Sequence, residues 1–349
     1  MKSAINNKIR ASNIELLRVL AMCLIFLNHL SYHGGFFEYS TGVNRHVANL
    51  FVCGGKLGVA VFVLIGAYFL IEKSFKMVNV IGLWIKTFII SVIGAFFMFL
   101  TSCSIKDLIR GILPFYTAVL WFVPVYIVLL FLSPFLNKLI HNISKLQLFL
   151  LILVLLYPLG IIPMLRGGDD VFLGTGNLSW FVYLYFIASY IRLYIDEGIM
   201  KYKWIVLVIF ICGYFTMFLL IELFGVDGLP FRSNGSLLIL ICSISMLLFF
   251  GKCIRTFQSR IINILGKASF VVYLMHDNPA RELIWKNILK TPNYYTSSFF
   301  IVYAILLVVV FFTISIIVNE ILQFLNKIVL NTKPVINFCN TIDSLMKID

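Results

Sequence analysis

Long apolar stretches separated by short polar segments run through most of the chain. Each stretch holds about 17–25 mostly apolar residues, the length that crosses a bilayer core as a helix. We place them at 14–33, 47–71, 79–101, 114–136, 146–164, 177–195, 203–224, 235–251, 261–277 and 298–325. Lipid offers the backbone no hydrogen-bond partner, and the stretches are too long and too evenly apolar for barrel strands. The pattern therefore predicts an all-α, polytopic integral membrane protein of about ten transmembrane helices.

The composition agrees with a membrane protein rather than a soluble one. Hydrophobic residues make up 61% of the chain and charged residues 12%, whereas globular proteins average roughly 45–50% and about 25%. An apolar excess of this size cannot be hidden inside a soluble globule. We therefore expect residues 1–349 to form one membrane-embedded domain of a multi-pass cell-membrane protein, with short tails at 1–13 and 326–349.

The distribution of basic residues sets the expected orientation. With the N-terminus in the cytoplasm, sixteen of the 28 Lys and Arg residues lie in inner segments, eight lie in outer segments, and four lie within helices or at their edges. This excess follows the positive-inside rule and predicts that both termini are cytoplasmic. The net charge of +13 is then mostly a topology signal, and nucleic acid is not an expected partner.

Three ionisable residues lie inside the first predicted helix: Glu15, Arg18 and His29. Eleven residues separate Arg18 from His29, which is three helical turns plus about 20°, so the two side chains share one face about 16 Å apart. Glu15 lies one turn before Arg18 and can pair with it. Charged and titratable side chains on one face of a membrane helix indicate that this face lines a polar pathway. The alternative is that Arg18 extends to the inner interface while His29 is an interfacial histidine.

A second histidine, His33, follows His29 by four residues, the spacing of zinc-binding pairs on helices. No matching acidic residue is evident in the sequence, and the seven cysteines form no C-x-x-C pair. An interfacial loop position explains His33 more simply. We therefore expect no metal site.

Four motifs, in order along the chain, resemble those of the acyltransferase-3 family of membrane proteins. The first motif is an acid, then Arg, then ten residues, then His, and here it consists of Glu15, Arg18 and His29. The others are the glycine-containing run 58–70, Leu120-Trp121-Phe122 followed by Pro134, and the segment Leu265–His276, which resembles L-G-x-x-S-x-x-I-Y-L-x-H with Val272 at the Ile position. The chain departs from the family pattern in having Gly66-Ala67 where the family has Ser-Gly. It also has only Lys86, preceded by Lys73 and Lys76, where the family has an Arg-rich stretch.

The resemblance implies transfer of an acyl group, usually acetyl, from cytoplasmic acyl-CoA to a hydroxyl of a surface or lipid-linked carbohydrate. His29 is then the candidate general base, because imidazole titrates nearest neutrality, although an acyl-histidine relay is also open. We expect the oxyanion of the intermediate to find a donor in Asn28, Ser269 or Tyr273.

The late motif ends in His276, which lies as far past the start of its helix as His29 does. The two imidazoles should therefore have similar depths, and His276 could orient the acceptor. The alternative is that His276 is an interfacial histidine paired with its neighbour Asp277. Trp121 could stand beside the acceptor, or serve only as an interface anchor.

The acyl-CoA phosphates need cations at the inner end of the bundle. Arg18, Lys73, Lys76 and Lys86 are the candidates for this role; the positive-inside bias alone would also explain the lysines. A transporter or flippase for a glycan or an ion is the alternative function, because it would use the same buried charges. Inverted repeats would support a transporter, and the sequence shows no such symmetry.

Overall fold

A computed structural model of the protein describes residues 11–102, 105–114, 120–166, 177–225, 230–231 and 234–347. Its described residues are almost entirely helical and contain no β-strand. The start of the predicted segment 114–136 and most of the loop between the fifth and sixth segments lie outside these ranges. The all-α membrane fold predicted from the pattern is confirmed.

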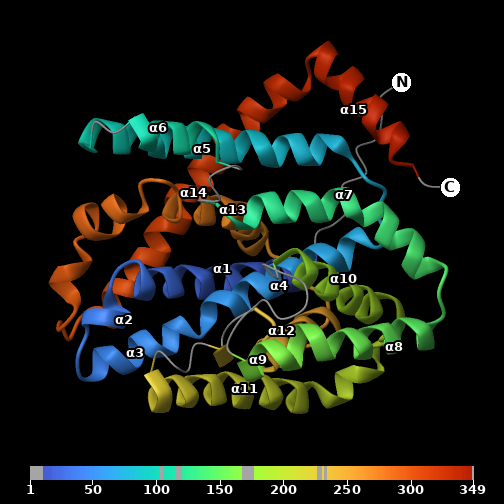
Figure 1. Ribbon diagram of the computed structural model, residues 1–349, viewed down its shortest axis with the longest axis horizontal. Helices are drawn as coiled ribbons and strands as arrows, with labels where there is room; N and C mark the ends of the chain where they lie inside the picture. The colour runs from blue at the N-terminus through green and yellow to red at the C-terminus, as the bar shows by residue number, and fades with distance from the viewer. Residues whose placement is uncertain are drawn as a thin grey trace.

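Most of the helices lie roughly parallel in one bundle (Figure 1). The α-helices are α1 (Ser12–Tyr32), α2 (Phe36–Tyr39), α3 (Val43–Val52), α4 (Gly54–Leu70), α5 (Met77–Ser102), α6 (Ile105–Ile112), α7 (Phe122–His141), α8 (Lys145–Leu156), α9 (Ile162–Arg166), α10 (Asn177–Tyr194), α11 (Lys203–Phe224), α12 (Leu237–Leu248), α13 (Arg260–His276), α14 (Phe300–Leu330) and α15 (Lys333–Leu345). Short π and 3-10 segments are η1 (Tyr157–Ile161), η2 (Glu197–Tyr202), η4 (Phe249–Cys253), η5 (Leu283–Ile288) and η6 (Thr291–Tyr294).

Every segment predicted to cross the membrane contains a helix. Among the described residues, seven helical stretches are long and apolar enough to span a bilayer. The other three predicted segments correspond to α10, α13 and the pair α12 and η4. The count of ten crossings and the cytoplasmic location of both termini stay predictions.

The boundaries differ from the prediction in three places. α7 begins at Phe122 rather than near 114, with Pro124 in its first turn, where a missing N–H costs nothing. The segment 47–71 divides at Cys53 into α3 and α4. The expected C-terminal tail begins within α14, which runs on to Leu330, and also contains α15, a helix with Pro334 in its first turn.

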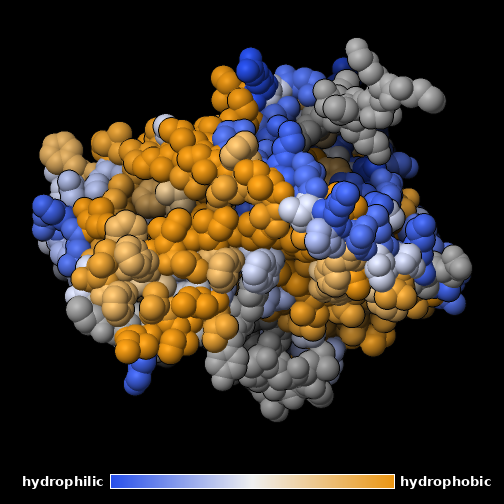
Figure 2. All heavy atoms as spheres, turned by 90° about the horizontal axis from the view of Figure 1, so that it is seen from above, coloured by the Kyte–Doolittle hydropathy of each residue, from blue (hydrophilic) through white to orange (hydrophobic). Residues whose placement is uncertain are grey.

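Apolar side chains cover the broad middle of the face shown in Figure 2, and polar side chains gather towards its right and at its left edge. Many large apolar side chains remain exposed, among them Ile301, Ile305 and Val309 of α14 and Ile205 and Val208 of α11. A soluble protein rarely exposes apolar patches of this extent, so lipid is the expected cover.

Helix α1 lies at the centre of the bundle, where it packs mainly against α4 and α13 (Figure 1). Glycines allow these close approaches. A Cβ at Gly58 of α4 would press on the backbone of Ala21 and the side chain of Ile25, and one at Gly55 would collide with Asn28. Small residues at helix interfaces are typical of membrane bundles. This packing fixes the face of α1 that carries the predicted site residues.

Candidate active site

Glu15 and Arg18 form an ion pair near the start of α1, with Arg18 Nη1 2.8 Å from Glu15 Oε2. Glu15 is buried, while the Arg18 side chain is about a quarter exposed. α13 crosses α1 here at Gly266, where a Cβ would collide with the Glu15 carboxylate. The pair expected from the three-residue spacing is therefore present, and glycine makes room for it.

His29 lies near the other end of α1 and contacts His276, the last residue of α13. Its Nδ1 is 2.9 Å from His276 Nε2. His276 is fully buried and its ring packs edge-on against Phe26, Trp285 and Phe311. The structure thus brings together the two histidines that the sequence placed at similar depth on separate helices.

The hydrogen bonds of His276 determine which nitrogens carry protons when both rings are neutral. His276 Nδ1 lies 2.6 Å from the carbonyl oxygen of Val272, which can only accept, so Nδ1 is the protonated nitrogen. His276 Nε2 is then an acceptor, and His29 Nδ1 must donate to it. The remaining nitrogen of His29, Nε2, therefore carries a lone pair, as a general base requires.

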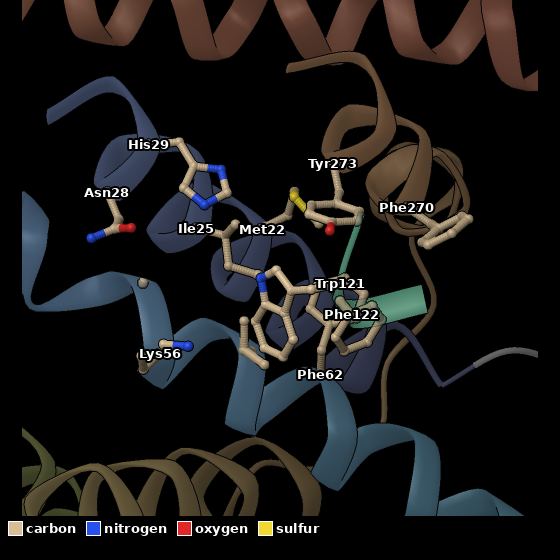
Figure 3. A pocket seen from close by; sticks show the side chains of 12 residues that line it. Met22, Ile25, Asn28, His29, Lys56, Phe62, Trp121, Phe122, Phe270 and Tyr273 are labelled. Atoms are coloured by element: carbon tan, nitrogen blue, oxygen red, sulfur yellow. The ribbon is translucent and has the colours of Figure 1, made fainter. Parts of the chain in front are cut away.

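A small cavity of about 80 Å³ adjoins His29. Its lining comes from α1, α4, the start of α7 and α13, and comprises Met22, Ile25, Asn28, His29, Gly55, Lys56, Val59, Phe62, Trp121, Phe122, Phe270 and Tyr273. Figure 3 shows the His29 ring with one nitrogen directed into this space and the Tyr273 hydroxyl facing it from the other side. Tyr273 Oη is buried and has no partner at full hydrogen-bond geometry within the described residues, although Asp277 and the backbone of Phe122 lie near it. It lines the same cavity as the His29 ring.

Arg18 lines a second, larger cavity of about 690 Å³. Three phenylalanines, Phe62, Phe122 and Phe270, line both this cavity and that of His29. They therefore lie between the two cavities, and we call these three residues the aromatic partition. Lys86 and Lys267 also line the Arg18 cavity, and no acidic residue is among its described lining residues.

Some predicted site residues do not reach either cavity in the expected way. Ser269 is fully buried and donates to the Leu265 carbonyl, so its hydroxyl is already used. Asn28 lines the small cavity, but its amide donates to the Val52 carbonyl at 3.0 Å. Lys73 and Lys76 line a different cavity near α15, where Lys76 lies 3.9 Å from Asp343. Of the four predicted cations, only Arg18 and Lys86 line the larger cavity that adjoins the His29 space.

Trp121 lines the His29 cavity, and the Lys56 ammonium lies 4.4 Å from the centre of its indole ring. Lys56 did not stand out in the sequence, because one lysine near a helix end is ordinary. The structure reveals it by placing α4 beside the N-terminal end of α7.

His33 has an acidic neighbour that the sequence did not reveal. Ligand atoms of His29, His33 and Asp277 lie within 4.8 Å of one another. Asp277 lies just after α13, so only the fold brings it to the histidines. Its Oδ1 already lies 3.1 Å from Arg281 Nη1, and a metal ion here would have to compete with that guanidinium.

Comparison with known proteins gives one match. A family model described as an acyltransferase domain, Acyl_transf_3, matches residues 12–320. No curated protein and no solved structure matches the chain. The match covers nearly the whole chain and contains the Glu15–Arg18 pair, both histidines and all residues around the His29 cavity. Of the residues that line the larger cavity, Gln323, Asn326 and Leu330 lie beyond the matched range. The chain therefore belongs to the acyltransferase-3 family, and it is a membrane acyltransferase.

Proposed function

We propose that the protein, embedded in the cell membrane, transfers an acetyl group from cytoplasmic acetyl-CoA to a hydroxyl of a cell-surface or lipid-linked carbohydrate. The observation that carries the proposal is the lone pair of His29 Nε2 beside a small cavity, itself adjacent to a larger cationic one. A base beside the small cavity and cations in the large one are what transfer between a hydroxyl and an anionic thioester needs.

In the proposed reaction His29 Nε2 takes the proton of the acceptor hydroxyl as its oxygen attacks the thioester carbonyl carbon. The C–S bond then breaks, and the CoA thiolate takes the proton back from the His29 imidazolium. The products are an ester and free CoA, and no proton is gained or lost. Tyr273 Oη donates a hydrogen bond to the oxyanion in this proposal. The sequence left Asn28, Ser269 and Tyr273 as candidates for that role.

The size of the small cavity supports a short acyl group. The cavity beside His29 measures about 80 Å³ and the one beside Arg18 about 690 Å³, so the space next to the base suits a short acyl group better than a long one. His276 does not contact the acceptor in this proposal, because its two nitrogens are used by Val272 and His29. Its role is to hold the His29 ring and its tautomer.

The test is to purify the protein in lipid nanodiscs and to follow acetyl label from acetyl-CoA into a carbohydrate fraction, together with release of the CoA thiol. We expect His29→Ala to lower the rate at least a hundredfold, within the usual range for a general base. His141→Ala is the matched control, since His141 is exposed and, within the described residues, bonds to the carbonyl of Asn137 in its own helix. Normal transfer by His29→Ala would refute the proposal that His29 is the general base.

The same assay separates the general base from an acyl-histidine relay. Without acceptor, a relay would leave acetyl label on the protein at His29, whereas a general base would leave none.

A further inference from the structure

Helix α14 carries a polar face that the reaction described above does not use. It is the most apolar of the seven candidate membrane spans, yet Asn319 and Asn326 are buried in it, 2% and 8% exposed. Asn319, Gln323 and Asn326 lie within about 60° of one another around the helix, because their spacings are four and three residues. We call these three residues the carboxamide face. A buried carboxamide costs free energy unless its hydrogen bonds are made.

The hydrogen bonds of this face are only partly made within the protein. Lys86 Nζ donates to Asn319 Oδ1 at 3.1 Å, and Asn326 Nδ2 donates to the Gly82 carbonyl at 3.0 Å. These contacts join α14 to α5. The other polar atom of Asn326, its Oδ1, is buried and has no donor within the described residues. An orphaned buried acceptor is uncommon and calls for a donor that the described residues do not supply.

The carboxamide face lines the larger cavity, the one that contains Arg18 and Lys86. Asn326 and Gln323 lie closer to the C-terminal end of α14, and Asn319 lies further along the helix towards its middle. The same cavity reaches Phe62, Phe122 and Phe270, beyond which lies the space next to His29. A ligand along this wall would therefore point at the aromatic partition.

We propose that the carboxamide face binds the pantetheine arm of the acyl-CoA donor, with Asn326 Oδ1 accepting a hydrogen bond from a pantetheine amide N–H. This inference rests on the proposed donor. Pantetheine has two amide groups along a thin chain, and carboxamides at successive helical positions offer both donors and acceptors to such groups. The cations of the cavity suit the phosphates instead, which leaves the amide-rich arm for the carboxamide wall.

The test compares two donors that share the arm but differ in the nucleotide: acetyl-CoA and acetyl-pantetheine. We expect Asn326→Leu to raise KM for both donors about tenfold, since a factor of ten corresponds to the loss of roughly one hydrogen bond. The turnover number should stay unchanged. Asn337→Leu, at an exposed position of α15, is the matched control and should leave both KM values as they are.

Other outcomes overturn the proposal. An increase confined to acetyl-CoA would place the nucleotide, not the arm, against α14. Unchanged KM values for both donors would remove the face from the donor site. Gln323→Leu, which changes an exposed side chain on the same wall, decides between these outcomes if Asn326→Leu fails to accumulate. Direct titration of the unaltered protein with CoA tests the proposed donor separately from the carboxamide face. If CoA does not bind, the proposal that acyl-CoA is the donor is refuted.

Discussion

His29 and His276 are 247 residues apart in the sequence, yet their imidazoles face each other with 2.9 Å between Nδ1 and Nε2. The contact joins the ends of α1 and α13, and a backbone carbonyl fixes the proton on the far side of His276. One ring thereby sets the tautomer of the other. The Val272 carbonyl orients His276, and His276 in turn orients His29. His276 therefore has the role that a carboxylate has when it orients a histidine ligand or base.

This relationship predicts a graded effect of substitutions at position 276. His276→Leu removes the acceptor for His29 Nδ1, so the ring is free to turn and to take the other tautomer. We expect a ten- to hundredfold lower kcat with little change in KM for the donor, because the loss falls on the reacting geometry. His276→Gln keeps an acceptor oxygen and should recover part of that loss.

The control for that prediction is protein stability. The melting temperature and the pH profile of kcat are measured for both variants. If Gln and Leu lower kcat equally while the pH profile stays unchanged, His276 fills space and does not position His29.

Much of this arrangement could be predicted from the sequence. The spacing of Glu15, Arg18 and His29 on one helix predicted their common face, and the motif ending in His276 predicted a second imidazole at the same depth. Both predictions depend on local helical geometry, which a periodic sequence determines well. The contact between the two rings depends on the packing of α1 against α13, which the sequence pattern does not give.

The donor side shows the same division. Lys73, Lys76 and Lys86 are equivalent as charges in a sequence, but only Lys86 faces the cavity of Arg18, because the turn before α5 directs the other two towards α15. The polar face of α14 is also visible in the sequence, although the family motifs do not include it. Asn319, Gln323 and Asn326 share a face of a very apolar helix, and a polar face of this kind needs a partner.

The aromatic partition predicts selectivity for short acyl groups. Phe270→Ala shortens one of the three side chains that line both cavities and enlarges the space beside His29. We expect transfer of butyryl from butyryl-CoA to rise at least tenfold relative to acetyl, measured as the ratio of kcat/KM values. Phe250→Ala, on a half-buried phenylalanine that lines neither cavity, should leave the ratio unchanged. An unchanged ratio in Phe270→Ala would show that chain length is selected elsewhere.

The Glu15–Arg18 pair predicts two separable effects. Arg18→Gln removes the guanidinium that pairs with the buried Glu15 carboxylate and should destabilise the protein by roughly 1–3 kcal/mol, less than for a fully buried pair because Arg18 is partly exposed. It should also weaken CoA binding, because the cavity loses a cation. Adding Glu15→Gln removes the buried negative charge, so the double variant should regain stability but not CoA affinity. Thermal melting and CoA titration on both variants check this. If CoA affinity returned with stability, Arg18 would act only through the fold.

The orientation of the bundle is open to a direct labelling test. With a cytoplasmic N-terminus, α13 runs outward, so residue 258 before it faces the cytoplasm and residue 287 beyond it faces outside. Both positions are exposed in the structure. In a variant with all seven native cysteines replaced by alanine, Asn287→Cys should react with a membrane-impermeant maleimide added to intact cells. Gln258→Cys should react only after the membrane is opened. The cationic Arg18 cavity would then open towards the compartment that makes acyl-CoA, and His29 would lie in the outer half, nearer the carbohydrate. The opposite labelling would place His29 in the inner half and Arg18 near the outer surface, and a cytoplasmic acyl-CoA would then have no path to the cations proposed to hold it.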